Sequence, residues 1–153
     1  MNLRRRQKAG FTLVELVIVM AVISVVLSII IPNLQGMQAE SQLTKADGEL
    51  NTLQTAITSY WRNNSNLYPT NITTDLINAS PQIIPAALTD PFGTAGYTYG
   101  YLSGNDTVFG DYFIVYTQGP RRDTTSPAWD STNQRVTYTG GGRVVSNAPV
   151  RKE

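Results

Sequence analysis

Glu15 is the residue whose chemistry most needs an explanation. It is a carboxylate inside the run Phe11 to Ile31, FTLVELVIVMAVISVVLSIII, in which 17 of the 21 residues are apolar. A charged side chain in such surroundings is costly, and by default it marks a function. An unpaired carboxylate among apolar groups is strongly disfavoured. Glu15 is therefore a candidate functional residue.

Catalytic chemistry finds little support in the composition. The chain has no cysteine and no histidine. This excludes a disulfide framework, thiolate metal ligands and any nucleophile that relies on a histidine base. An enzyme would need a carboxylate pair such as Asp106 and Asp111, or a serine–lysine arrangement using Lys45, and the spacing supports neither. We expect no enzymatic activity, no metal site and no cofactor.

A membrane helix is the element that would position Glu15. At a rise of about 1.5 Å per residue, Phe11 to Ile31 spans about 31 Å, close to the hydrocarbon thickness of a bilayer. Eleven of these residues are valine or isoleucine, which are mediocre helix formers in water, but in lipid the backbone must satisfy its own hydrogen bonds. Positive charges precede the run and place the N-terminus in the cytoplasm. They are Arg4, Arg5, Arg6 and Lys8.

Two ordinary explanations of this run compete with a specialised one. A cleaved secretory signal usually has a shorter apolar core followed by a small-residue cleavage site, whereas Pro32-Asn33-Leu34-Gln35-Gly36 follows here. A simple membrane anchor fits the length better. It leaves Glu15 unexplained, however, so a helix with a further function stays open.

The order of residues in this segment resembles the type IV pilin and type II secretion pseudopilin superfamily. The resemblance rests on a basic leader, Gly10, the stretch Phe11-Thr12-Leu13-Val14-Glu15, and an apolar helix interrupted by Pro32. It covers residues 4 to 36, under a quarter of the chain. In that family a prepilin peptidase cuts after the glycine and methylates the new N-terminal phenylalanine. The resemblance implies a cleaved leader, residues 1–10, and N-methylation of Phe11.

The residue types in this motif suit a polymer. Cleavage would create an amine on Phe11 with an ordinary pKa of about 7.7–8.0, and methylation would keep its charge. Glu15 lies four residues further on, one helical turn away, and in a staggered bundle it can pair with the amine of a neighbouring subunit. Such a pair would fix the register of the subunits more than their affinity. Pro32 removes an amide donor, so a bend or local melting is expected there.

An amphipathic pattern follows the apolar run. Spacings of three and four over a polar background predict that the helix continues through residues 32–62 and ends before the Asn63–Asn66 stretch. We interpret its apolar stripe as domain core. The stripe consists of Leu43, Ala46, Leu50, Leu53, Ile57 and Tyr60.

Residues 63–153 predict a globular α+β domain of the pilin-like kind, with a small antiparallel sheet packed on the long helix. A short helix is expected from a cap at Thr73 or Thr74 to Ser80-Pro81. Strands are expected at residues 97–101 and 112–117, followed by a hairpin of residues 135–139 and 143–145 around three glycines. Aromatic residues should pack the domain. They are Tyr97, Tyr99, Tyr101, Trp61 and Trp129.

The C-terminal half resembles the major pseudopilin of type II secretion in particular. The resemblance rests on Tyr68-Pro69-Thr70 and on Asp90-Pro91-Phe92-Gly93 before a tyrosine-rich strand. Major pseudopilins typically end in a loop, rich in glycine and aspartate, that holds calcium. Here residues 119–130 carry two adjacent arginines, and Asp123 and Asp130 are the candidate ligands. We expect a solvated loop without calcium.

The resemblance implies a structural subunit of a type II secretion pseudopilus, which polymerises through its N-terminal helix to help drive protein export across the outer membrane. The alternatives are the major pilin of a type IV pilus and a minor pilin-like subunit. The implied partners are other copies of the chain, the prepilin peptidase, the assembly platform and minor subunits. The subunit would cross the inner membrane once, with its C-terminal domain in the periplasm. A net charge of +1 without a basic stripe gives no reason to expect nucleic acid.

Overall fold

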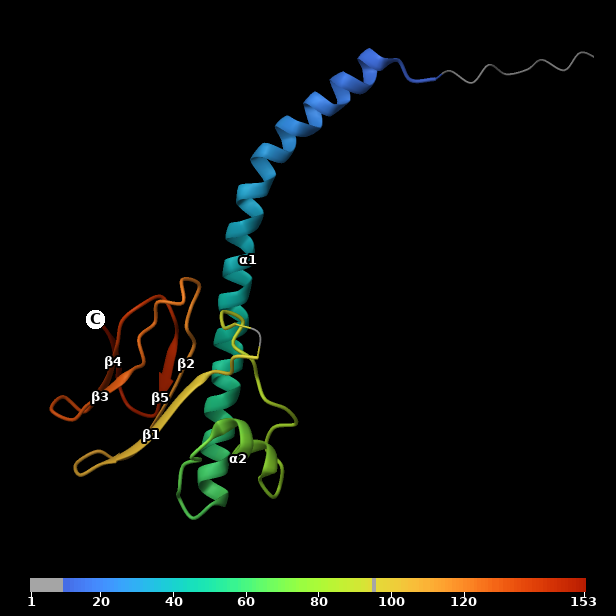
Figure 1. Ribbon diagram of the computed structural model, residues 1–153. Helices are drawn as coiled ribbons and strands as arrows, with labels where there is room; N and C mark the ends of the chain where they lie inside the picture. Colours follow the sequence, from blue (N-terminus) through green and yellow to red (C-terminus); the bar gives the residue numbers. More distant parts are fainter. Residues whose placement is uncertain (1–9, 95) are drawn as a thin grey trace, which may run out of the picture. The chain divides into compact units, whose positions relative to one another are not determined.

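The computed structural model describes residues 10–94 and 96–153 (Figure 1). The chain divides into two compact units, one ending at Gln38 and the other running from Ala39 to Glu153. The basic residues of the expected leader, Arg4, Arg5, Arg6 and Lys8, lie outside the described residues. In chain order the elements are α1 (Leu13–Asn63), α2 (Ile72–Asn78), β1 (Gly100–Asp106), β2 (Gly110–Tyr116), β3 (Ala128–Asp130), β4 (Arg135–Tyr138), β5 (Val144–Ser146) and β6 (Val150–Lys152).

Helix α1 contributes residues to both units. Its 51 residues end at Asn63, one residue beyond the predicted end. The backbone is helical at position 32, so the local melting that we expected at Pro32 is absent. The side chain of Pro32 lies outside the described part of the structure, and a bend at this position stays a prediction.

The second unit is built on the apolar stripe of α1. Ala46, Leu50, Leu53 and Ile57 are at most 2% exposed, which confirms that the stripe is core. Leu43 and Tyr60 at its ends are half-buried. Leu50, Leu53 and Ile57 of the stripe pack in one cluster with residues from α2, the following loop and the sheet. Burial of this apolar surface is the main favourable contribution to folding. The partners in the cluster are Ile72, Leu76, Ile84, Tyr99, Phe113 and Val115.

The short helix α2 is capped by Asn71. The side-chain oxygen of Asn71 accepts hydrogen bonds from the amides of Thr73, at 2.8 Å, and Thr74, at 3.3 Å. The predicted cap at Thr73 or Thr74 was therefore wrong, because both threonines lie in the first turn and asparagine is at least as good a cap. The helix directs Ile72 and Leu76 into the core.

The strands form two three-stranded sheets, with the orders β1-β2-β5 and β3-β4-β6. All pairs are antiparallel except β4 with β6, which is parallel. A long helix with a small, mainly antiparallel β structure confirms the predicted α+β, pilin-like class. The strand predicted at residues 112–117 is β2, whereas the strand predicted at 97–101 begins only at Gly100.

The predicted C-terminal hairpin was wrong. Strand β4 pairs with β3 and β6, and β5 pairs with β2, so the two segments belong to different sheets. The reason is the close approach of the glycines between them to the loop that follows β2. A Cβ on Gly142 would overlap the carbonyl of Thr117, and one on Gly140 would overlap the backbone of Asp123. The glycines let the chain cross over against this loop instead of turning back.

Both faces of the β1-β2-β5 sheet carry apolar side chains. Phe113 and Val115 join the core on α1, whereas Ile114 packs with Val136 and Ala148 in a second cluster. A strand that is buried on both faces typically has a continuous run of apolar residues in its sequence. The sequence from Tyr112 onward has such a run.

Aromatic side chains pack the domain, as predicted for Tyr99 and Trp129. Tyr99 is 3% exposed, and its hydroxyl donates a 2.6 Å hydrogen bond to the Glu49 carboxylate of α1. Burial raises the pKa of Tyr99 above its ordinary value, and Glu49 raises it further, so the hydroxyl stays a donor. Trp129 stacks on Tyr112 with ring centres 4.4 Å apart and contacts Phe109.

Gly100 of β1 allows Tyr116 of β2 to lie across it. The two residues are direct partners in the ladder, and a Cβ on Gly100 would overlap the Tyr116 ring. The Tyr116 hydroxyl hydrogen-bonds Ser126 at 3.0 Å, so the ring is held in place from its far end. The packing of this pair therefore depends on glycine at position 100.

The fragment from Ala39 to Glu153 should fold by itself as a soluble monomer. Its core cluster lies entirely within the second unit, and the long exposed apolar run lies upstream of it. Light scattering coupled to size-exclusion chromatography should give the mass of one chain. A fragment that remained a tight oligomer would place self-association in the globular part.

Two glycine-to-alanine substitutions in this fragment should change its free energy of unfolding in opposite directions. Gly100→Ala should destabilise by about 1–3 kcal/mol, because the Cβ overpacks against Tyr116. Gly48→Ala should stabilise by about 1 kcal/mol, because Gly48 is an exposed position within α1 with no atom near its would-be Cβ. Urea unfolding of both variants gives the two differences. A Gly100→Ala fragment as stable as the unchanged one would contradict the strand packing described above.

Candidate functional site

The predicted processing residues lie in an exposed segment before α1. Gly10 and Phe11 are outside regular secondary structure, and Phe11 is 82% exposed. A Cβ on Gly10 would meet no atom within 4 Å. Exposed segments without secondary structure are the preferred sites of proteolytic cleavage. The Gly10–Phe11 bond is therefore accessible to a peptidase in this conformation.

Thr12 and Glu15 cap the start of α1 reciprocally. The Glu15 amide donates to the Thr12 hydroxyl oxygen at 3.2 Å, and the Thr12 amide donates to the Glu15 carboxylate at 3.4 Å. The Leu16 amide donates to the Thr12 carbonyl at 3.2 Å. These contacts form a capping box, which satisfies two amides that would otherwise lack a partner at the helix start. The helix therefore begins at Leu13, with its negative charge at the end where the helix dipole favours one.

The capping box turns the Glu15 carboxylate toward the N-terminal end of the helix. It contacts the amide of Thr12, and a cleaved chain would carry its amine on the adjacent residue, Phe11. A cation and an anion would then lie at the same helix end. Sequence analysis assigned a role to Glu15 and missed Thr12, although the threonine-x-x-glutamate spacing is a readable capping signal.

The helix beyond the cap presents an apolar surface on all sides. Every residue from 11 to 31 is exposed. The hydroxyls in this stretch are satisfied within the helix, since Ser24 donates to the Met20 carbonyl at 2.8 Å and Ser28 to the Val25 carbonyl at 2.7 Å. In the described residues, α1 alone is long and apolar enough to span a membrane. Such a surface suits lipid or other copies of the same helix.

The carboxylates considered for catalysis serve the local structure. Asp106 accepts hydrogen bonds from the amides of Phe109 and Val108 and from the indole of Trp129, and these bonds lower its pKa. Asp111 accepts a 2.6 Å hydrogen bond from the Asn105 side chain. Each carboxylate therefore shapes the turn or the strand pair to which it belongs.

The two candidate calcium ligands are also separately engaged. Asp123 accepts a 2.8 Å hydrogen bond from the Gly141 amide. Asp130 accepts from the amides of Thr132 and Asn133 and lies 3.6 Å from Arg135. Across residues 10–94 and 96–153, no three acidic, histidine or cysteine side chains are grouped as metal ligands would be.

Comparison with known families identifies the N-terminal segment. The family described as "Prokaryotic N-terminal methylation motif" matches residues 5–31. This match includes Gly10, Phe11 and the Thr12–Glu15 capping box. It supports processing and modification at the start of α1.

Comparison with curated proteins extends the similarity into the globular part. The chain is 29% identical over 128 residues to "Type II secretion system core protein G" of Vibrio cholerae, which covers 76% of this chain and 85% of that protein. It is 32% identical over 68 residues to the protein of the same description from Aeromonas hydrophila, and there the match spans about half of the relative, 47%. A "Fimbrial protein" of Pseudomonas aeruginosa is 43% identical over 54 residues, 35% of each chain. No solved structure matches the chain significantly.

These matches establish two points. The chain carries an N-terminal methylation motif, and it is homologous to type II secretion core protein G, with a shorter match to fimbrial proteins.

Proposed function

We propose that the chain is a structural subunit of a type II secretion pseudopilus, and that it polymerises through α1 to help drive protein export across the outer membrane. One observation carries this proposal: the similarity to a core protein G extends over 128 residues, far beyond the apolar helix. The fimbrial match covers 54 residues, which favours the surface-pilus alternative less. A minor pilin-like subunit is the other alternative. The descriptions of these relatives name no enzymatic reaction, and we propose none for this chain.

Processing is the first step of the proposed function. A prepilin peptidase would cut the Gly10–Phe11 bond on the cytoplasmic side, remove residues 1–10 and methylate Phe11. The methylation motif at residues 5–31 and the exposed segment before α1 support this step. The cut leaves the capping box intact, because Thr12 and Glu15 both lie on the mature side.

Before assembly, the subunit would cross the inner membrane once through residues 11–31. The basic leader holds the N-terminus in the cytoplasm, and the second unit lies in the periplasm. The apolar, all-round exposed helix supports this arrangement. Assembly would transfer the same surface from lipid to a bundle of identical helices in a periplasmic pseudopilus, with an assembly platform and minor subunits as further partners.

Within the bundle, the protonated amine of Phe11 would pair with Glu15 of a neighbouring subunit. The capping box supports this pairing, because it keeps the carboxylate at the helix end where the amine of a staggered neighbour arrives. A charge left unpaired there costs several kcal/mol, so the pair selects one register among many that the apolar surface would tolerate.

The mature protein should consist of residues 11–153, which is 143 of the 153 residues, with a methylated amine on Phe11. Intact-mass spectrometry of the membrane fraction measures this directly. A bulky residue in place of Gly10 should leave an unprocessed and unassembled precursor in the membrane. A mature form that retains Arg4 to Arg6, or that starts after Pro32, would refute the proposed processing.

Loss of the negative charge at Glu15 should reduce filament growth more than loss of the capping box does. Glu15→Gln removes the charge, but glutamine can still complete a capping box. We expect normal processing and membrane insertion with few or no filaments, because the incoming amine lacks a partner at a cost of several kcal/mol. Glu15→Leu should behave alike, and Glu15→Asp should be intermediate because its reach is shorter. Filament yield and secretion of a reporter protein, relative to the level of processed subunit, measure the effect.

Thr12→Ala is the matched control for this experiment. It removes one half of the capping box, at a cost of about 0.5–2 kcal/mol to the helix start, and leaves the carboxylate charged. Filaments should still form. Normal filaments with Glu15→Gln and Glu15→Leu would exclude the pairing mechanism and favour a simple membrane anchor.

A further inference from the structure

Arg122 joins the loop after β2 to a distant turn. Its Nε donates a 2.7 Å hydrogen bond to the Phe92 carbonyl, and its guanidinium also contacts the Gly93 carbonyl at 3.5 Å. The Arg122 amide donates to the Gly119 carbonyl at 3.0 Å, and the residue has a φ of 54°. A side chain at such a left-handed position is uncommon and points to a local constraint. Here the conformation aims the guanidinium at two backbone carbonyls.

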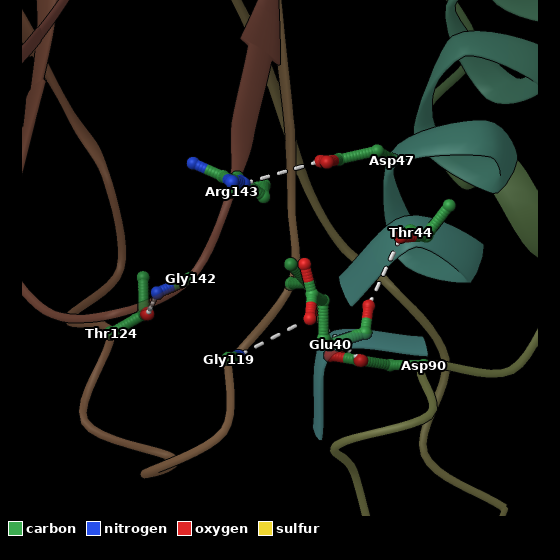
Figure 2. Close-up of polar contacts among 9 residues, drawn as sticks. Glu40, Thr44, Asp47, Asp90, Gly119, Thr124, Gly142 and Arg143 are labelled. Carbon is green, nitrogen blue, oxygen red and sulfur yellow. Dashed lines mark hydrogen bonds and ion pairs between the residues drawn. The ribbon is translucent and has the colours of Figure 1, made fainter. Parts of the chain in front are cut away.

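Asp90 anchors the start of the same loop. Its carboxylate is buried, 4% exposed, and accepts hydrogen bonds from the Thr117 hydroxyl at 2.6 Å and the Gln118 amide at 2.8 Å. It also accepts from the Phe92 amide at 3.0 Å. Figure 2 shows Asp90 beside the segment that contains Gly119. The turn at residues 90–93 therefore contacts the loop in two ways. The Asp90 carboxylate binds Thr117 and Gln118, and the Phe92 carbonyl binds the Arg122 guanidinium.

The end of the loop at Asp123 and Thr124 is hydrogen-bonded to Gly141 and Gly142, where the chain crosses between the two sheets. Asp123 accepts from the Gly141 amide at 2.8 Å. The Thr124 hydroxyl accepts from the Gly142 amide at 2.7 Å (Figure 2) and donates to the Gln118 carbonyl at 2.7 Å. The loop is thus closed by hydrogen bonds within the chain on both sides.

This arrangement does not fit a calcium ion. Calcium takes six to eight oxygen ligands. The carboxylates of Asp90 and Asp123 and the carbonyls of Phe92 and Gln118 already accept hydrogen bonds from the chain. A guanidinium also brings its own positive charge to the loop, which repels a second cation. Two of the nearby carbonyls, those of Phe92 and Gly93, instead accept from a cationic side chain of the loop itself.

We propose that the Arg122 guanidinium takes the place of a divalent cation in this loop, so that residues 117–125 fold independently of calcium. The guanidinium supplies a positive charge at the carbonyls of Phe92 and Gly93. This role of Arg122 affects the folding of the second unit and is independent of whether the chain forms a pseudopilus.

Amide hydrogen exchange on the full-length chain in detergent tests the proposal. Peptides covering residues 117–125 should exchange at the same rate in calcium chloride and in a calcium chelator. Arg122→Asn should speed their exchange about tenfold, because a charge-assisted hydrogen bond is lost. Asparagine is well tolerated at a left-handed φ, so the change isolates the guanidinium from the backbone conformation. Arg121→Ala is the matched control, since no hydrogen bond or ion pair is found for this exposed neighbour's side chain in the described structure, and exchange should stay unchanged.

Two results would overturn the proposal. One is slower exchange of residues 117–125 in the wild-type chain when calcium is added. The other is unchanged exchange with Arg122→Asn. If Arg122→Asn does not yield folded protein, Arg122→Gln replaces it. This variant keeps a donor but no charge, and wild-type exchange rates with it would equally contradict the proposal.

Discussion

An apolar surface that its own chain leaves uncovered is the constraint on which the rest of this protein depends. Residues 11–31 are all exposed, and their backbone and hydroxyl groups are satisfied along the helix itself. Such a surface is unstable in water, so it must lie in lipid or against other copies of itself. The capping box of Thr12 and Glu15 starts this helix, and in the proposed function the basic leader would orient it and the Glu15 carboxylate would restrict how it packs.

In the second unit, the chain itself buries most of the apolar surface of α1. From Ala46 onward, α1 has one apolar stripe instead of an all-round apolar surface, and residues of the sheet, of α2 and of the loop after it bury Leu50, Leu53 and Ile57 of that stripe. Little apolar surface is then left to draw the globular part into the membrane or into unspecific association. The division between the units at Gln38 and Ala39 follows this change of pattern.

Local patterns were predictable from the sequence, and long-range pairings were not. The spacing of Leu50, Leu53 and Ile57 fixes a buried helix face through geometry alone, and the motif from Gly10 to Glu15 is contiguous. The glycines at 140–142 look the same in a hairpin and in a crossover, and what distinguishes the two is the contact of Gly142 with Thr117, which depends on the assembled sheets. The hydrogen bond from Arg122 to the Phe92 carbonyl could not be predicted, because the two residues lie 30 positions apart in the sequence.

The inward hydrogen bonds of Ser24 and Ser28 have a mechanical consequence for a filament. Because these two hydroxyls donate to the carbonyls of their own helix, neither proton is left to donate to a neighbouring helix. In the proposed filament, the pairing of Glu15 would fix how far neighbours slide along each other but not how they rotate. A bundle of such helices should resist stretching more strongly than twisting, and it should change its pitch under torque without breaking.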